Sequence, residues 1–323
     1  MLLVLDKGKS RRQQERERVE RLHAQTQRAV NVAFRQYVAQ ASAPPGFADL
    51  WAAGQIDLIG ELLDRPIATF ANATVSAFID AGSATTAALG RKLVQKADKP
   101  EVTLSFNVTD PRTVALMQRN RLLWVQGLTR SAKTSVRAAL VAGVRQGLGL
   151  REVARQFRHA IGLTERQQRD LRVFADGQRQ LRADDLDMPE AQRGPIFSDA
   201  HIDRLVDQRA EQDIRRRAER IARTEATRIV GQAQDEALRQ SLEAVGQPKQ
   251  LTGKEWQSRH DGRTRDAHSE RDGTRRRLDQ AFAPGIHKPG DGPPQEAINC
   301  RCVLTYEFFS TEAELAAWLA GGT

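Results

Sequence analysis

Apolar residues recur at the spacing of an α-helix through most of the first 245 residues. The first predicted helix covers residues 10–40 and ends where two prolines and a glycine follow, at 41–47. Its apolar positions are Val30, Phe34, Tyr37 and Val38. A second helical region is expected from about residue 55 to residue 93, where Pro66 either kinks the helix or begins a new one. Its predicted core-facing residues are Leu58, Ile59, Leu62, Leu63, Ile67 and Phe70.

The next region begins with residues 102–108, which are the early strand candidate of the chain. Helical spacing then resumes, because Asp110 is a favourable N-cap and the next residue is a proline, which suits the first helical position. Further helical stretches are expected at 131–149 and 149–163. The polar and proline-containing sequence of residues 183–197 predicts a loop.

The longest periodic segment of the chain begins after Ser198, which is a predicted N-cap, and runs to residue 245. An unbroken helix of this length would be about 70 Å long. Gly231 is the one glycine inside the segment. The predicted buried face consists of Ile202, Leu205, Val206, Ile214, Ile221, Ile229, Ala233, Ala237, Leu238 and Leu242.

Helical periodicity is lost after residue 248, where glycine, proline, aspartate and arginine become frequent. Short strands are expected within 249–256 and 300–309, and a final helix follows Thr311, which has capping-box spacing to Glu314. The predicted fold is mainly α: an elongated helical body with a long helix, followed by a small loop-rich α+β domain. The predicted division is 1–109, 110–248, 249–309 and a C-terminal helix at 310–323.

Charge adds a hypothesis about partners. The net charge is +9, and only nine of the 50 basic residues are lysine. Arginine binds phosphate and carboxylate groups in a bidentate manner, so the excess favours either contact with a polyanion or dense ion pairs. The candidate nucleic-acid contacts are Arg215, Arg216, Arg217 and Arg220. No apolar run approaches the roughly 20 residues of a membrane span, and the chain is expected to be cytosolic when it is made.

The two cysteines of the chain, Cys300 and Cys302, lie one residue apart, with three of the six histidines within 42 residues upstream. Thiolate and imidazole groups are the ligands of structural zinc. A zinc ion held by Cys300, Cys302 and His268, with His287 or Asp261 as the fourth ligand, is therefore one hypothesis. The alternative is that both thiols pack as small buried apolar groups at the start of a strand.

A second reading of the same region is catalytic. If a short helix opens near Thr264, Arg265 and His268 share one of its faces, and His268 meets Asp272 at i,i+4. Such a cluster could cleave a phosphodiester, with histidine as the base. The alternative is a polar network that holds a loop in place. No phosphate-binding glycine motif is present in the sequence.

Residues 220–306 resemble a known family, the phage Mu F-like minor head proteins. The resemblance rests on Trp256, on the runs "DGRTRDAHSERDG" (261–273) and "INCRCVLTY" (298–306), and on the upstream helix "RIARTEATRIVGQA" (220–233). A more diffuse similarity extends back to about residue 110. The motif residues are Trp256, Asp261, Arg263, Arg265, His268, Asp272, Gly273, Asn299, Cys300, Arg301 and Cys302.

The resemblance implies a minor capsid protein of a tailed bacteriophage or prophage, made in the host cytoplasm and located inside the virion head near the portal. The partners it implies are the portal protein and packaged double-stranded DNA, with the major capsid protein or a scaffolding protein as further candidates. It implies no enzymatic activity. The alternative drawn from the residues themselves is a metal-dependent nuclease or hydrolase that uses His268, Asp261, Cys300 and Cys302.

Overall fold

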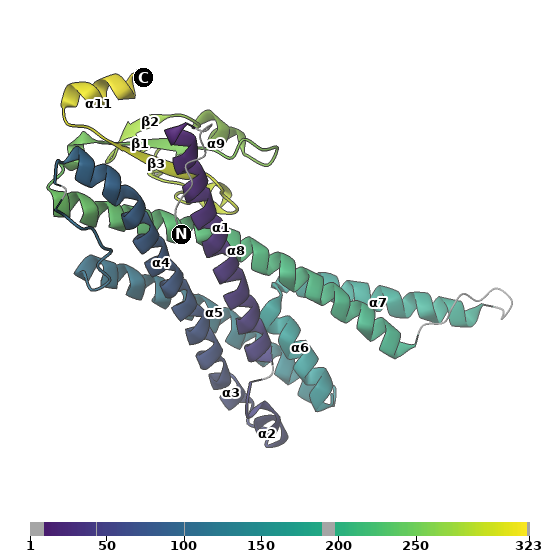
Figure 1. The fold of residues 1–323 in the computed structure, drawn as a ribbon. Helices are drawn as coiled ribbons and strands as arrows, with labels where there is room; N and C mark the ends of the chain where they lie inside the picture. The colour runs from purple at the N-terminus through teal and green to yellow at the C-terminus, as the bar shows by residue number, and fades with distance from the viewer. Residues whose placement is uncertain (1–9, 43, 100, 189–197, 322–323) are drawn as a thin grey trace. The chain divides into compact units, whose positions relative to one another are not determined.

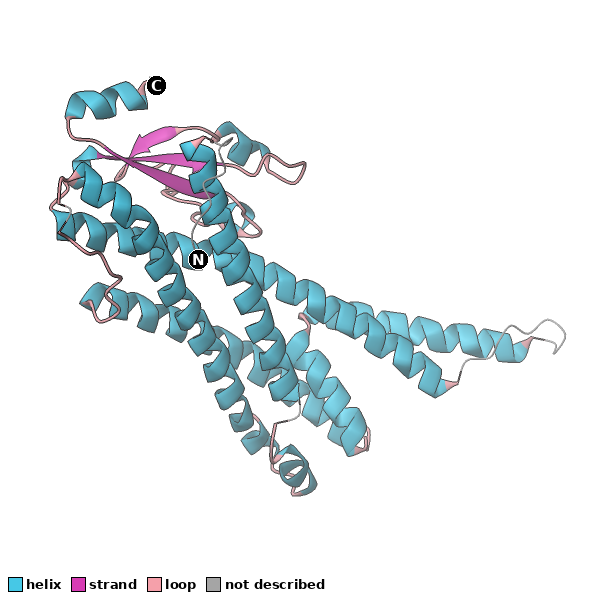
Figure 2. Cartoon of the chain, in the orientation of Figure 1, coloured by secondary structure: helices cyan, strands magenta, loops and turns pink. Residues whose placement is uncertain are grey.

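The computed structural model describes residues 10–42, 44–99, 101–188 and 198–321. Within these ranges the chain is mainly α-helical, with a small three-stranded sheet toward its C-terminal end (Figure 2). The predicted class, a mainly α protein with a small α+β C-terminal part, is therefore confirmed. None of the helices in the described ranges is both long enough and apolar enough to cross a membrane.

The chain divides into two compact units, each assembled from segments that are far apart in sequence. The first unit takes residues 1–31, 72–121 and 220–323, and the second takes 32–71 and 122–219. Four helices contribute to both units: α1 (Arg11–Ser42), α4 (Asp64–Lys96), α5 (Pro111–Arg145) and α8 (Asp199–Val245) (Figure 1). The division predicted from the sequence, in contrast, follows the order of the chain.

The second unit is entirely helical in its described part. Besides segments of the four long helices it contains α2 (Phe47–Ala52), α3 (Ile56–Ile59), the 3-10 turn η1 (Glu61–Leu63), α6 (Leu150–Gly162) and α7 (Glu165–Asp187). An aromatic cluster forms part of its core, where the Phe70 ring lies 5.8 Å from Phe34 and 4.9 Å from Trp124, edge-on to both. The predicted core position Leu58 is wrong, since 42% of this residue is exposed.

The structure decides two helix boundaries in the second unit, one that the sequence left open and one that it placed differently. Pro66 lies in the first turn of α4, so it accompanies the start of a new helix and does not kink an existing one. Helix α7 continues to Asp187, past the predicted start of a loop at residue 183. The rest of that predicted loop, 189–197, lies outside the described residues.

The strand predicted at 102–108 is wrong. Within the described residues this segment of the first unit has no regular secondary structure and joins no sheet, and its alternating apolar side chains pack onto a helix instead. Leu104 and Phe106 lie against Gly90 and Gly82 of α4, and the Phe106 ring is 6.0 Å from that of Phe78. Small residues on α4 therefore receive the side chains that the alternation suggested for a sheet.

Two predicted helix starts are confirmed by their caps. The Asp110 carboxylate accepts hydrogen bonds from the backbone N–H groups of Arg112 and Thr113, at 2.9 and 3.3 Å. The Ser198 hydroxyl accepts one from the His201 N–H at 3.2 Å, and α8 then continues unbroken for 47 residues. Gly231 does not interrupt α8. The Lys288 side chain packs on the helix at this position, where a Cβ would lie 3.2 Å from the Lys288 Cδ.

The sheet has the order β2-β1-β3 and is antiparallel throughout. The central strand β1 (Thr252–Gln257) pairs with β3 (Val303–Phe308) along its whole length; β3 falls within its predicted region, and β1 ends one residue beyond its own. The short edge strand β2 (Arg275–Arg277) was not predicted. Between the strands lie two short helices, α9 (Asp266–Glu270) and α10 (Pro294–Ala297), and α11 (Glu312–Leu319) follows β3. The predicted cap of α11 is confirmed, since Thr311 accepts a hydrogen bond from the Glu314 N–H at 3.2 Å.

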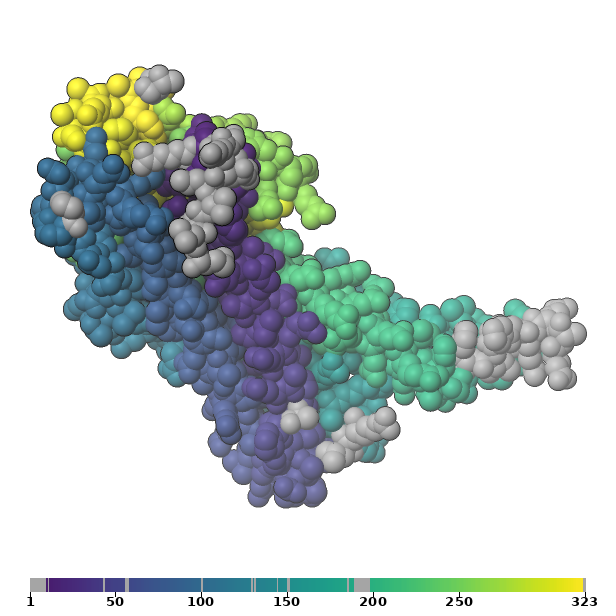
Figure 3. All heavy atoms as spheres, in the orientation of Figure 1, coloured from purple at the N-terminus to yellow at the C-terminus, as the bar shows by residue number. Residues whose placement is uncertain are grey.

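The sheet shares one apolar core with the helices of the first unit. This core contains Leu89 and Leu93 from α4 and Leu238 and Leu242 from α8, besides residues of β1 and β3. The start of α1 also lies against this region, as Figure 3 shows, and its Arg12 forms an ion pair with the buried Glu255 of β1. The small domain is thus covered by helices from three distant parts of the sequence.

Candidate metal centre

The side chain of His268 lies in the interior of the C-terminal domain. Helix α9 carries it, and the residue is only 3% exposed. Its ring stands edge-on to Trp256 of β1, with 5.7 Å between the centroids and an angle of 88° between the planes. Arg265, directly before α9, donates hydrogen bonds to the backbone carbonyls of Glu296 and Ile298, so α9 is tied to the segment that leads into the two cysteines.

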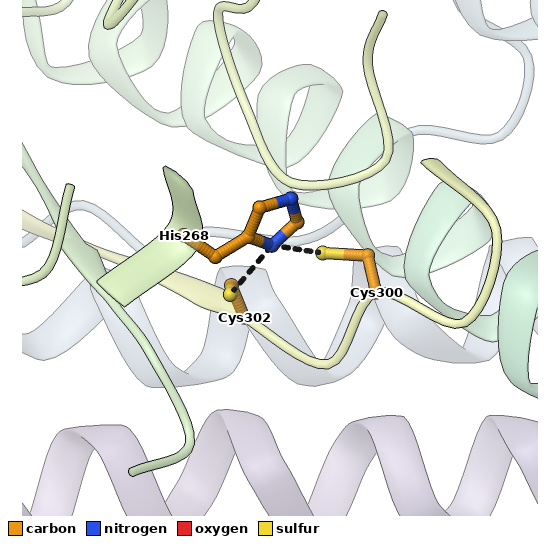
Figure 4. A group of neighbouring side chains, drawn as sticks. All are labelled: His268, Cys300 and Cys302. Atoms are coloured by element: carbon orange, nitrogen blue, oxygen red, sulfur yellow. Dashed lines mark hydrogen bonds between the residues drawn. The ribbon is translucent and has the colours of Figure 1, made fainter. Parts of the chain in front are cut away.

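Cys300 and Cys302 direct their sulfur atoms toward the same nitrogen of His268. The distances from its Nδ1 are 3.6 Å to the Cys300 Sγ and 3.3 Å to the Cys302 Sγ (Figure 4). All three donor atoms lie within 4.8 Å of one another, and all three residues are buried. The cysteines are free thiols just before β3. The sequence prediction that His268, Cys300 and Cys302 come together thus agrees with the geometry.

The other nitrogen of His268 has a carboxylate partner. Its Nε2 lies 2.9 Å from the Glu296 Oε2, and Arg271 donates to the same oxygen at 2.8 Å. The Arg271 hydrogen bond is the main cause that lowers the pKa of Glu296, so this group is an anion at neutral pH. The anionic Glu296 accepts a hydrogen bond from the Nε2–H, while Nδ1 faces the thiols; the hydrogen bond with Cys300, followed by the one with Glu296, raises the pKa of His268.

The two thiols differ electrostatically. The pKa of Cys300 is lowered to about 5, first because Cys302 donates a hydrogen bond to its sulfur and next because of His268. The pKa of Cys302 is raised, because its proton is held by Cys300 and because the group is buried. The two thiols and His268 therefore titrate as one coupled group, in which Cys300 is the more acidic thiol.

Helix α8 holds the backbone of the cysteine segment in place. The Thr227 hydroxyl donates to the Cys300 carbonyl at 2.6 Å, and the Thr224 hydroxyl accepts from the Asn299 N–H at 3.2 Å. Arg223 donates to the Asn299 side chain, and Asn299 has a positive φ of 60°, which turns the chain toward α8. Residues 222–228 of α8 ("ARTEATR") thus position the cysteine segment, a role that was not predicted from the sequence.

Several motif residues lie beside the His-Cys group without joining it. Arg301 binds both carboxylate oxygens of Asp261, at 2.5 and 2.6 Å, and Asp261 does not belong to the described group of donor atoms around His268. Asp272 accepts from the Ser258 N–H at 2.6 Å and pairs with His260 at 3.0 Å. The predicted His268–Asp272 pair is therefore wrong, because Glu296 occupies the place next to the histidine.

The remaining motif residues shape the backbone around the site. Gly273 has a positive φ of 70° and donates its N–H to the Trp256 carbonyl at 2.8 Å, which turns the chain into β2. The Arg263 N–H donates to the Asp261 carboxylate at 3.1 Å. Both contacts hold the loop that carries α9.

His287 does not lie with the other three predicted ligands. It is exposed, its backbone N–H donates to Asp291, and its side chain lines a different cavity that also contains Lys254. In the described part of the chain, the group of possible metal ligands consists of His268, Cys300 and Cys302 and does not include His287. The sequence offered His287 only as a candidate for the fourth ligand, because nothing in its loop-rich segment indicates the path of the chain.

The four arginines proposed to contact nucleic acid differ in their surroundings. Arg215 and Arg216 are exposed and form ion pairs with Glu211 and Asp213 of the same helix. Arg220 is also exposed. Arg217 instead donates to the Ile161 carbonyl at 3.2 Å and lies 5.7 Å above the Phe34 ring, and burial lowers its pKa. Its guanidinium is thus engaged inside the second unit.

The structure defines a mainly α-helical protein whose C-terminal α+β domain contains a buried group of one histidine and two cysteines. Comparison with protein families adds an identity. The family model described as phage Mu protein F-like protein matches residues 134–305, which is more than half of the chain. The chain therefore belongs to this family of phage head morphogenesis proteins, as its sequence motifs indicated. Comparison with the curated proteins gave no match, and comparison with the solved structures gave none either.

Proposed function

We propose that the protein is a minor structural component of a bacteriophage head, located inside the head near the portal, where it binds the portal protein and contacts packaged DNA. The observation that carries this proposal is the family match, which spans the long helix α8 and most of the C-terminal domain. Head morphogenesis proteins work by contact with other head components, so the major capsid protein and a scaffolding protein are further candidate partners.

The charge of the chain supports the DNA part of the proposal. A net charge of +9 on a chain of 323 residues favours contact with a polyanion, because each bound cation releases counterions from the DNA. The exposed arginines Arg215, Arg216 and Arg220 of α8 are candidate phosphate contacts, whereas the surroundings of Arg217 exclude it from that row.

The nuclease alternative finds little support in the geometry. Asp261 would have to act beside His268, but Arg301 engages both of its oxygens. The cavity next to the cysteines has a volume of about 10 Å³, which is the space of one water molecule and not of a phosphodiester. We therefore propose a structural role and no enzymatic one.

Particle composition tests the location. Quantitative mass spectrometry of purified particles from the source phage is expected to find the protein in far fewer copies than the major shell protein. Particles that lack the portal should also lack this protein. Its absence from complete particles, or a copy number equal to that of the shell protein, would contradict the proposal.

DNA binding is expected to be independent of sequence and steeply dependent on salt. Affinity for double-stranded DNA should fall sharply between about 50 and 200 mM salt. A variant with Arg215, Arg216 and Arg220 changed to Gln should lower the slope of log affinity against log salt by up to about three. The matched control changes Arg166, Arg169 and Arg172, three exposed arginines of α7, to Gln. Affinity that does not respond to salt would refute DNA contact, and equal losses in both variants would refute the role of α8.

A further inference from the structure

We propose that His268, Cys300 and Cys302 bind one zinc ion, which joins α9 to the start of β3 and stabilises the C-terminal domain. This inference concerns the stability of the fold and does not depend on the proposed location in the phage head. It assigns the ligands, the residue that orients the histidine, and the nature of the fourth ligand.

The donor atoms already have the spacing of a tetrahedral zinc site. With a Zn–N bond of about 2.0 Å and a Zn–S bond of about 2.3 Å, the distance between N and S in a tetrahedron is about 3.5 Å. The two N–S distances here are 3.3 and 3.6 Å. One nitrogen and two sulfurs also select against calcium and magnesium, which prefer oxygen ligands.

The second nitrogen of His268 has the partner that zinc-binding histidines commonly have. Such a histidine donates its other N–H to a carboxylate, which fixes the ring and raises its basicity. Glu296 is in this position at 2.9 Å, and Arg271 holds the carboxylate from the other side at 2.8 Å. The orientation of the ring is therefore set by groups that are not ligands themselves.

The cysteine segment is also positioned without the ion. Thr227 and Thr224 hold the backbone at Cys300 and Asn299 against α8. Because Cys300 and Cys302 flank a single residue, fixing this short turn places both sulfurs at once. A site whose ligands are held in this way loses little conformational entropy on binding the ion.

The zinc ion would cross-link the part of the domain between β1 and β3, which contains little regular secondary structure. The described chain between β1 and β3 forms one strand of three residues and two short helices, and the rest is loop. His268 and Cys302 are 34 residues apart, so one ion would close a long loop. Binding energy of this kind is folding energy, because the ligands are not assembled in the unfolded chain.

The fourth ligand is inferred to be a water molecule. Among the described residues, no fourth histidine, cysteine or carboxylate joins the group. Beside the three donors lies a cavity of about 10 Å³, lined also by Arg263 and Arg301, which has room for one water and for nothing larger. Three protein ligands and a water also occur at catalytic zinc sites, but the small size of this cavity leaves no space for a substrate beside the ion, so the ion is assigned a role in stabilising the fold.

Metal analysis of the full chain tests the site. Protein purified without a polyhistidine tag is expected to carry about one equivalent of zinc by elemental analysis. The double variant Cys300→Ser with Cys302→Ser should lose it, and the control His287→Ala should keep it. Cobalt should replace zinc in the wild type and give the thiolate charge-transfer and d–d bands of a four-coordinate thiolate site.

A second variant separates the ligands from the residue that orients them. Glu296→Gln keeps all three donors, so it should still bind one equivalent at excess zinc, but with an affinity about 10- to 100-fold lower in competition with a fluorescent chelator. Stripping the wild type with a chelator should make both thiols reactive toward a disulfide reagent and lower the unfolding temperature. Adding zinc back should reverse both changes.

Three results would overturn the proposal. The first is metal-free wild-type protein that does not take up zinc and still has a folded C-terminal domain. The second is zinc retained by the double cysteine variant. If that variant does not fold, cobalt-loaded wild type without a thiolate charge-transfer band is the third, since it excludes the cysteines as ligands.

Discussion

Replacing Trp256 with alanine is expected to remove about 3–5 kcal/mol from the free energy of unfolding, the range for large aromatic side chains lost from a core. Trp256 is 1% exposed and stands in the central strand of the sheet. Its ring meets Phe282 edge-on at 5.2 Å and His268 at 5.7 Å, and the Arg271 guanidinium lies 5.6 Å from its centroid. The alanine variant would leave a cavity that these three groups share.

Chemical denaturation followed by circular dichroism measures this loss. The matched control is Trp318→Ala in α11, because Trp318 is only partly buried, although it packs over Gly253 of the same strand. The control should lose clearly less stability than the Trp256 variant. An equal loss in both, or a Trp256 loss under about 1 kcal/mol, would show that the core of the domain lies elsewhere.

Changing Arg239 to methionine is expected to cost about 3–5 kcal/mol, because it leaves a buried carboxylate without its cation. Arg239 of α8 pairs with the buried Glu236 one turn earlier and, at 2.8 Å, with Asp110 at the start of α5. Thr113 also donates to Glu236, at 2.7 Å. The network thus joins the start of α5 to α8 within the first unit.

Acid should partly rescue the Arg239 variant. Burial alone would raise the pKa of Glu236, but hydrogen bonds from Arg239 and Thr113 outweigh it, and the net pKa is lowered. A lowered carboxyl pKa stabilises the wild type above the pKa of the unfolded state, and this stability is lost as the pH falls. Without Arg239, burial dominates and Glu236 takes up a proton more readily, so the deficit relative to wild type should shrink toward acid pH.

The control for this prediction is Arg215→Met on the exposed face of α8, where an ion pair contributes little. Denaturation midpoints of the two variants, measured from neutral to acid pH, should differ most at neutral pH. A deficit of the Arg239 variant that does not change with pH would contradict the proposed origin of the cost.

The helices were the predictable part of the fold, because their signals are local. The cap residues Asp110, Ser198 and Thr311 each act within a few positions of the chain, and all three behave as predicted. The alternation at 102–108 was misleading because a strand and an extended segment lying on a helix bury the same alternate side chains. The strand β2 escaped prediction because it is three arginines long and has no apolar pattern.

The amino-acid sequence by itself determined the mainly α class, the long helix α8, the family, and the residue types of the candidate centre. Only the tertiary structure decided that His287 and Asp261 stay apart from the thiols, that Glu296 orients His268, and that Arg217 is engaged inside the second unit. The physical reason is the distance along the chain over which each kind of interaction acts. Periodicity and caps act over a few residues of one element, whereas these contacts join residues 28 to 56 positions apart through loops whose path the packed helices impose.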